Sequence, residues 1–341
     1  MCSKFISTCA VIILLLTNTA KAASPFANPD EGMWLLSLLK DLNIQQMQKM
    51  GMQMTADDLY NPNGPSLKDA IVQFGGFCTG EFVSDKGLVF TNHHCGYDAI
   101  AGVSTTENNY LDNGFWAKKY SEEIPIPGLY VQILHHMEDV TDSIVPVVKD
   151  MDQATRMGTV RTLINTLTAN AQEKSGLDVE VKSMFYGNKY YIFYYQTYND
   201  VRLAGTAPQS VGKFGGDTDN WMWPRHTGDF SVFRVYANSN NEPAEYSENN
   251  VPFKPKKHLK ISLKEINEGD FTMVMGFPGS TKRYLTSYAM KDVIYQSNPA
   301  QIDVFKAVTD AEKAEMDKDD AVRLMLSADY ASLMNALKLW G

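Results

Sequence analysis

One stretch decides the fold, and it reads Gly87-Leu88-Val89-Phe90-Thr91-Asn92-His93-His94-Cys95-Gly96. It begins with a short apolar and β-branched run, and two similar runs precede it at 70–74 and 80–83. Gly75-Gly76 and Asp85-Lys86-Gly87 separate the runs, as turn residues separate the strands of hairpins. We therefore predict short antiparallel strands that end in a pair of histidines.

His94 is our candidate for a general base. Such a base must be held rigidly within hydrogen-bond reach of its nucleophile, and a histidine at a strand end, next to a tethered cysteine, meets that requirement. On an extended backbone His93 would point to the other side, which favours a structural role for it. A structural role for both histidines is the alternative.

A second informative stretch covers residues 215–235. It is a polar, Gly-rich loop with two tryptophans, and it runs through Gly228-Asp229-Phe230 into an alternating strand. Asp229 at the strand entry is placed to accept the other ring N–H of a catalytic histidine and to fix its tautomer. A turn-forming Asp after Gly is the alternative. Asn220 and Trp221 in the loop also fit loop polarity and core filling.

The remaining elements follow from periodicity. The apolar spacing at 33–42 predicts a surface helix, and 145–173 and 298–341 also have a helical period. Residues 179–195 predict paired strands, and 230–236 and 259–275 predict further strands. The fold class is therefore mixed β and α.

The N-terminus predicts a secretory signal peptide over residues 1–22. Lys4 precedes an apolar run from Cys9 to Leu16, and the small-residue pattern Ala20-Lys21-Ala22 follows it. We expect an exported protein, periplasmic or extracellular, because this segment directs secretion. A buried first helix is the alternative interpretation.

Composition excludes several classes of function. The 341 residues are 44% hydrophobic, which is enough for a large core and for more than one domain. No run of 18 apolar residues follows the first few dozen positions, so we predict no membrane span. Removal of Lys4 and Lys21 with the signal peptide changes the net charge from -9 to -11, which argues against nucleic acid as a partner.

Cys78 and Cys95 are the two cysteines of the predicted mature chain, since Cys2 and Cys9 belong to the signal peptide. Two cysteines in an exported chain predict one disulfide between them. The pair supplies too few ligands of the right spacing for a metal site, and we expect no metal and no cofactor.

These motifs resemble those of the bacterial serine dipeptidyl-peptidases of the dipeptidyl-peptidase 7 and 11 type, in the chymotrypsin clan. The resemblance rests on the 78–96 stretch and on Asp219-Asn220-Trp221 leading to Arg225-His226-Thr227-Gly228-Asp229-Phe230. It begins near Glu31 and continues through Gly276-Phe277-Pro278-Gly279 into the final helices. It therefore covers nearly the whole predicted mature chain.

The resemblance implies a fold and a set of roles. The fold is a chymotrypsin-like double β-barrel interrupted by a helical domain, with residues 23–284 in the peptidase domain and 285–341 at the start of the helical insertion. His94 would be the general base, Asp229 its orienting carboxylate, and Asn220 and Trp221 the groups that bind the substrate's α-amino group. The partners would be peptides with a free N-terminus. The sequence does not define the oligomeric state, and a homodimer stays open.

The nucleophile of that family lies in a Gly-Asn-Ser-Gly type of turn, and these 341 residues contain no such turn and no Gly-x-Ser-x-Gly. Ser210 and Ser280 lack neighbours that would build an oxyanion hole. We therefore interpret the chain as an N-terminal portion, with the serine beyond residue 341, and expect it to be inactive alone. The preferred penultimate residue of the substrate, acidic or hydrophobic, cannot be assigned from this portion.

Two other classes of function stay open. A catalytically dead, secreted peptide-binding protein could use the same scaffold, although a pure binder has no chemical need of the full His94, Asp229, Asn220 and Trp221 set. A metallopeptidase could use histidines as ligands, but none stands in a His-Glu-x-x-His spacing. The histidines in question are His93, His94, His135, His136 and His226.

Overall fold

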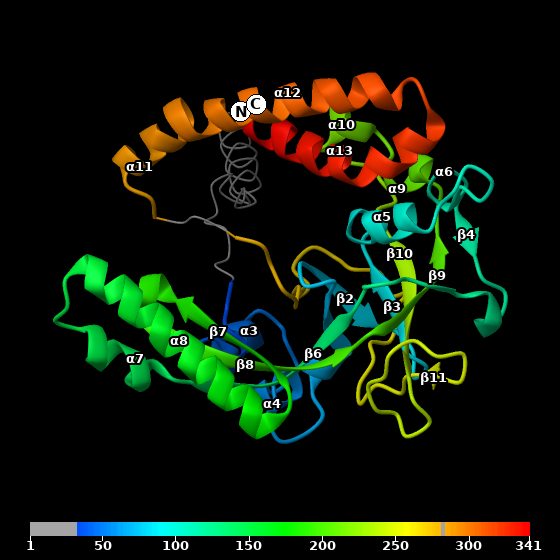
Figure 1. The fold of residues 1–341 in the computed structure, drawn as a ribbon. Helices are drawn as coiled ribbons and strands as arrows, with labels where there is room; N and C mark the ends of the chain where they lie inside the picture. The colour runs from blue at the N-terminus through cyan, green and yellow to red at the C-terminus, as the bar shows by residue number, and fades with distance from the viewer. Residues whose placement is uncertain (1–32, 281–283) are drawn as a thin grey trace, which may run out of the picture.

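The computed structural model describes residues 33–280 and 284–341. The predicted signal peptide, 1–22, lies outside these residues. Within them, a large antiparallel sheet is combined with helices at both of its ends (Figure 1). The mixed β and α class predicted from the sequence is therefore confirmed.

Eleven strands form one sheet, and every pair in it is antiparallel. The neighbouring strands follow the order β4-β9-β10-β3-β2-β1-β6-β8-β7, while β5 also pairs with β9 and β11 with β10. The strands are β1 (Ile71–Phe74), β2 (Cys78–Phe82), β3 (Leu88–Thr91), β4 (Phe115–Trp116), β5 (Ile124–Pro125), β6 (Val131–Asp139), β7 (Asp178–Met184), β8 (Lys189–Tyr198), β9 (Asp200–Thr206), β10 (Ser231–Ala237) and β11 (Val251–Pro252).

The helices of the N-terminal half are mostly short, and α8 is the long one. They are η1 (Leu36–Leu38), α2 (Leu39–Leu42), α3 (Ile44–Lys49), α4 (Ala56–Leu59), η2 (Leu67–Ala70), α5 (His93–Gly102), α6 (Tyr110–Asn113), η3 (Tyr120–Glu122), α7 (Thr141–Val148) and α8 (Gln153–Ser175). The later ones are η4 (Phe185–Gly187), α9 (Gln209–Gly212), α10 (Gly216–Asp219), α11 (Ser287–Asp292), the π-helical turn η5 (Val293–Ser297), α12 (Asn298–Met316) and α13 (Asp320–Trp340).

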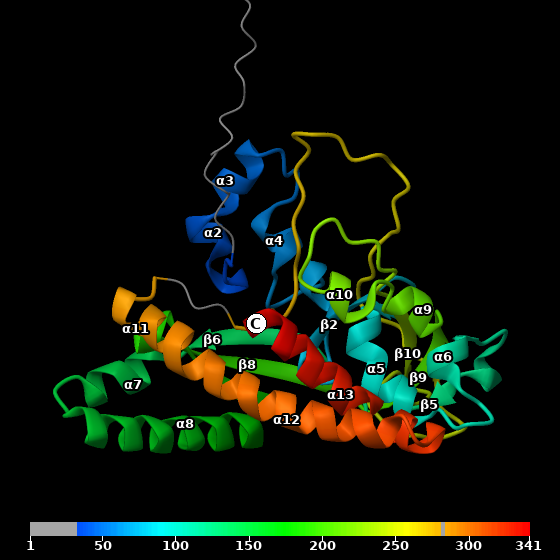
Figure 2. The same cartoon turned by 90° about the horizontal axis from the view of Figure 1, so that it is seen from above.

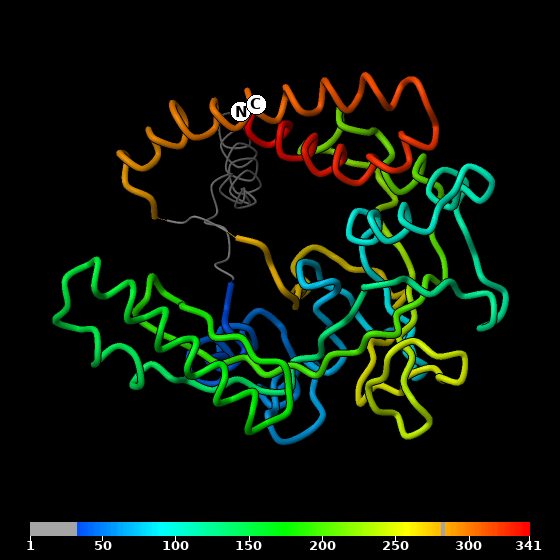
Figure 3. Tube along the Cα trace, in the orientation of Figure 1, coloured from blue at the N-terminus to red at the C-terminus, as the bar shows by residue number. Residues whose placement is uncertain are grey.

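Two helical layers accompany the sheet, one formed by α7 and α8 and the other by α12 and α13 (Figure 2). Helices α7 and α8 pack on β7 and β8 around Ile144, Ile192 and Tyr194. At the other end α12 and α13 form an antiparallel pair, and α13 lies against α5 and α10 (Figures 1 and 3). The salt bridge from Arg323 to Asp112, at 2.8 Å, connects α13 to α6. The last helix is therefore attached to α5, which carries His93 and His94.

The main core lies between the sheet and α5. Side chains that alternate along β3 and β10 point into it, because a strand has a side-chain period of two. Val89, Phe233 and Val235 are examples, and all three are fully buried. Burial of such side chains stabilises the fold by about 1.5–3 kcal/mol each. The strands that lead to His94 and Asp229 are consequently held by the best-buried part of the molecule.

A buried ion pair reinforces the edge of this core. Arg202 on β9 lies 2.7 Å from Asp200, and their side chains are 9% and 0% exposed. The guanidinium also stacks 3.7 Å from the ring centroid of Tyr236 and donates to the carbonyl of Ser247. The pair thus connects β9, β10 and the loop that follows β10.

Most of the elements predicted from periodicity are present. Strands β1, β2 and β3 match the three short runs, β7 and β8 are the predicted paired strands, and α8, α12 and α13 fall in the predicted helical segments. The predicted helix at 33–42 is broken into η1 and α2, with α3 following after Asn43.

The strands predicted at 259–275 are wrong: no strand is found there. An alternating run forms a strand only if another backbone pairs with it repeatedly, and among the described residues this segment makes a single such bond, from Leu259 N–H to the Phe82 carbonyl of β2 at 2.8 Å. Its apolar side chains are consequently exposed, with Leu263 at 97% and Val274 at 100%. Only Phe271, Met273 and Met275 pack, against the N-terminal helices.

The single sheet does not by itself define two β-barrels, so the double-barrel architecture stays a prediction. Within the described residues, no helix combines the length and the apolar character that crossing a membrane requires.

Replacement of Arg202 by Met should destabilise the fold by about 3–5 kcal/mol, because it leaves the Asp200 carboxylate buried without its ion partner. Urea unfolding measures this loss. Lys306→Met is the matched control: its pair with Asp310 is exposed on α12, and its loss should cost less than about 1 kcal/mol. Equal effects of the two changes would contradict the buried role of Arg202.

Candidate active site

His94 lies in the first turn of α5, immediately after β3. The strand ends at Thr91, Asn92 is extended with ψ 154°, and the helix begins at His93. Helix α5 can lie this close to β10 because residue 96 is glycine: a Cβ there would lie 2.7 Å from the hydroxyl of Ser231. The sequence predicted a histidine at the end of a strand; the structure places it in the first turn of the helix that follows the strand.

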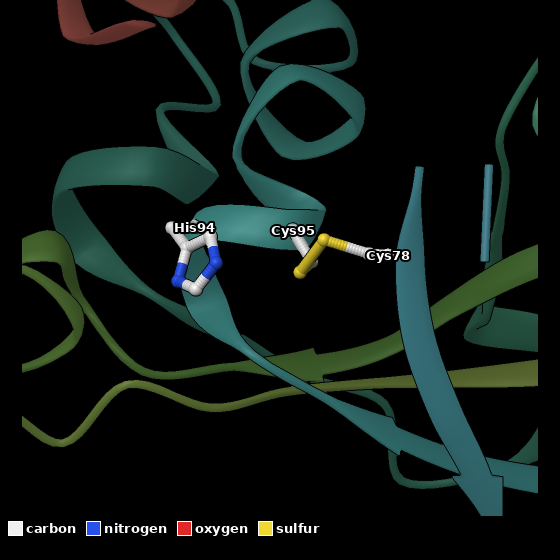
Figure 4. Close-up of side chains that lie close together, drawn as sticks. All are labelled: Cys78, His94 and Cys95. Carbon is white, nitrogen blue, oxygen red and sulfur yellow. A yellow bond between two sulfur atoms is a disulfide. The ribbon is translucent and has the colours of Figure 1, made fainter. Parts of the chain in front are cut away.

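A disulfide ties this helix to the sheet. Cys78 on β2 and Cys95 on α5 are bonded, with their Cα atoms 6.0 Å apart (Figure 4). Figure 4 shows the disulfide beside the His94 ring, between the helix that carries Cys95 and the strand that carries Cys78. The residue that follows the candidate base is thus covalently fixed to β2, the neighbour of β3 in the sheet.

Asp229 meets His94 from the loop before β10. Its Oδ2 lies 2.7 Å from His94 Nδ1, and its Oδ1 accepts a 3.0 Å hydrogen bond from the His94 backbone N–H. Ser231 pairs with Thr91 in the β3–β10 ladder, and this register brings the loop to the start of α5. One carboxylate therefore contacts both the backbone and the ring of the histidine.

This contact has two physical consequences. The carboxylate caps the N-terminus of α5 from another part of the chain, where a helix has unsatisfied N–H groups and a positive dipole end. Burial would raise the pKa of Asp229, but hydrogen bonds from the ring and the backbone of His94 outweigh it and hold that pKa below its usual value. Asp229 is therefore ionised and able to fix the His94 tautomer with Nε2 free.

The His94 ring is accessible, since its side chain is 68% exposed and that of Asp229 is 21% exposed. Within the described residues, Asp229 is the only hydrogen-bond partner of the ring. The arrangement is that of a general base with an orienting carboxylate, and its outer nitrogen is available to a nucleophile. Neither Ser210 nor Ser280 donates to this ring.

His93 is buried, with 1% of its surface exposed. It packs on Gly212, where a Cβ would come within 2.3 Å of the ring, and its Nδ1 lies 3.4 Å from Thr206 Oγ1. Burial lowers the pKa of the ring, so it is neutral. The extended backbone assumed in the sequence analysis is wrong. His93 turns inward because successive side chains on a helix point about 100° apart.

Asn220 and Trp221 follow α10 and are brought together with a residue that the sequence did not indicate, Asn335 on α13. The Asn220 amide donates to Asn335 Oδ1 at 2.8 Å, and Trp221 Nε1 donates to the Asn335 carbonyl at 3.1 Å. Arg225 donates to Asn220 Oδ1 at 3.2 Å. No local pattern marks Asn335, because its partners are more than 100 residues away.

Metal-ligand atoms of Cys78, His94 and Cys95 lie within 4.8 Å of one another. Both sulfurs are in the disulfide, however, and the thiolate is the form that binds metals, so this group is not a metal centre. No other group of three such ligands converges in the described part of the chain. His135 and His136 on β6 are close to each other, with their Nδ1 atoms 2.8 Å apart. They have no third metal-ligating side chain beside them among the described residues.

Replacement of Asp229 by Ala removes a helix cap together with the partner of His94. We expect a loss of about 1 kcal/mol of stability from the cap, and a larger loss would mean that α5 itself has unfolded. Chemical denaturation followed by circular dichroism measures it. Asp319→Ala is the control, because Asp319 caps α13 in the ordinary way through its own side chain. Wild-type stability of Asp229→Ala would contradict the capping role.

Comparison with known proteins gives one consistent family. The model of the family Peptidase S46 matches residues 29–341. A protein named dipeptidyl-peptidase 7 from Capnocytophaga gingivalis is 48% identical over 329 residues, which are 96% of this chain and 46% of that protein. A protein named Asp/Glu-specific dipeptidyl-peptidase from Porphyromonas gingivalis is 46% identical, over 96% of this chain and 46% of its own length.

Solved structures agree with the sequence matches. The crystal structure of Porphyromonas endodontalis DPP11 in complex with the dipeptide Arg-Asp superposes with a TM-score of 0.84 at 41% identity, over 91% of this chain and 46% of that one. The chain thus spans less than half the length of these relatives. The resemblance stated from the motifs is confirmed, and the chain belongs to the peptidase S46 family.

Proposed function

We propose that this chain supplies the general base and its orienting carboxylate to an exported serine-type dipeptidyl-peptidase. The observation that carries the proposal is the 2.7 Å contact between Asp229 and an accessible His94 ring. Family membership supports a dipeptidyl-peptidase, and the contact supports acyl transfer by nucleophilic catalysis as its chemistry.

The mechanism follows from the geometry of this pair. His94 Nε2 takes the proton from a serine hydroxyl, whose oxygen attacks the scissile carbonyl. Asp229 stabilises the imidazolium that forms. His94 then gives the proton to the leaving amine, an acyl-enzyme remains, and water attacks it with His94 again as base. We propose that the serine lies outside these 341 residues, so that the chain alone would be inactive.

Exopeptidase selectivity would come from Asn220, Trp221 and Asn335. Both amide oxygens and the Asn335 carbonyl are acceptors for an ammonium group, and Asn335 holds the other two residues. An ammonium group would add charge-assisted hydrogen bonds to these oxygens, and a substrate whose chain continues would lose them, so cleavage falls two residues in. The dipeptide complexes of Porphyromonas endodontalis DPP11 support peptides with a free N-terminus as the substrate class.

We also propose that the chain contributes the first barrel and the beginning of the second in a chymotrypsin-like double barrel, with a helical insertion starting near residue 285. The exposed apolar side chains at 259–275 support this, because they are what an unpaired strand of a second barrel would present.

In a full-length protein that includes the proposed serine, His94→Ala should lower kcat/KM on a chromogenic dipeptidyl substrate by about 10³-fold or more, since the base is lost. Asn335→Ala should raise KM more than it lowers kcat, because it acts on the substrate's terminus. Asn165→Ala on the exposed side of α8 is the control. Equal cleavage of N-acetylated and free-amine substrates would overturn the exopeptidase assignment.

Export is tested separately. We expect the mature protein to begin at Ala23 and to accumulate outside the cytoplasm. Leu14→Asp should keep it inside with Met1 intact, because a charge interrupts the apolar run. N-terminal sequencing of fractionated cells gives the answer, with Leu42→Asp as the control. An exported wild-type protein that retains residues 1–22 would contradict the proposed cleavage.

A further inference from the structure

Asn92 occupies the N-cap position of α5, but its side chain does not cap that helix. Asn is among the residues that most favour this position, because its side-chain oxygen normally accepts an N–H of the first turn. Here the amide instead donates to Asp229, to Oδ2 at 3.3 Å and to the backbone carbonyl at 3.2 Å. The cap that Asn92 does not provide is the 3.0 Å bond from His94 N–H to Asp229 Oδ1.

Asp229 Oδ2 therefore has two donors, the His94 ring and the Asn92 amide. We propose that Asn92 is a positioning residue: it fixes the carboxylate edge that meets His94 Nδ1 and takes part of the acceptor capacity of that oxygen. This inference deepens the proposed function, and its catalytic consequence rests on that function.

The backbone around Asn92 supports such a role. Its carbonyl accepts a 2.8 Å hydrogen bond from Ser231, which is fully buried at the start of β10. Asn92 and the 229–231 segment are thus joined by two hydrogen bonds. The Asn92 side chain donates to the Asp229 carbonyl, and the Ser231 side chain donates to the Asn92 carbonyl. A group held at two points keeps its direction better than an exposed amide with one contact.

The charged and titratable groups around the carboxylate are few. His93 and His94 of α5 act on Asp229 directly, and Lys213, which follows α9, acts on His93. Lys213 is itself paired with Asp217 at 3.2 Å. Asn92 is uncharged, so its removal changes the sharing of Oδ2 without adding a charge to this group.

Asn92→Ser separates positioning from capping. Serine is a good N-cap residue, so α5 keeps a cap, but its hydroxyl is too short to reproduce both bonds to Asp229. With one donor fewer, Oδ2 accepts more strongly from the protonated ring, and the pKa of His94 should rise by about half a unit. NMR titration of ¹³C-labelled histidine measures it, with His94→Gln used to assign the signal.

Asn109→Ser is the matched control, because Asn109 is the N-cap of α6 and does cap its own helix. We expect this control to leave the His94 titration unchanged, and both variants to melt within a few degrees of wild type. In protein that cleaves dipeptidyl substrates, the acid limb of kcat/KM should move upward by the same amount in Asn92→Ser, with the alkaline plateau retained.

An unchanged or lowered His94 pKa in Asn92→Ser would overturn the proposal, as would a lower plateau with no movement of the limb. The titration needs no enzymatic activity. A protein that cleaves no peptide but shows the shift would therefore retain the positioning role while the proposed function fails.

Discussion

The candidate site depends on one carboxylate placed at the beginning of one helix. Asp229 comes from a loop more than 130 residues after His94, yet it contacts the ring and the backbone of that residue at once. Such a contact is favourable only where water is partly excluded and the helix dipole adds to the hydrogen bonds. The register of the buried strands β3 and β10 determines where the loop and the helix meet. It therefore brings Asp229 to the N-terminus of α5, where the helix dipole acts.

The sequence predicted the catalytic candidates His94 and Asp229 better than it predicted the helix and the contacts around them. A histidine after a strand and an aspartate before another were enough to propose the pair, because few residue types can perform this chemistry. Helix α5 was not predicted, because its glycines and small residues give a weak helical pattern. The apolar strand just before it also made the histidines look like the end of that strand. The role of Asn335 is a tertiary contact between α13 and a distant loop, which no local period contains.

The errors in the fold have a common physical cause. Alternation predicts a strand only if a neighbouring backbone pairs along its length, and among the described residues 259–275 has one bond to a strand, from Leu259 to Phe82, and no ladder. The helix at 33–42 is interrupted even though its apolar spacing is regular, and its Leu39 shares an apolar cluster with Met47 and the 271–275 segment. Both cases show tertiary contacts deciding between local alternatives.

The disulfide between Cys78 and Cys95 has a consequence for when the site is completed. A bond that closes a loop with a sequence separation of 17 adds about 3 kcal/mol by restricting the unfolded chain. The cytoplasm keeps thiols reduced, so a chain made there would hold α5 by packing and by the Asp229 cap, without the covalent bond. If the chain is exported as proposed, the covalent link between α5 and β2 would form only after the chain has left the cytoplasm. Oxidation would then make the tether of His94 a late event in the life of the chain.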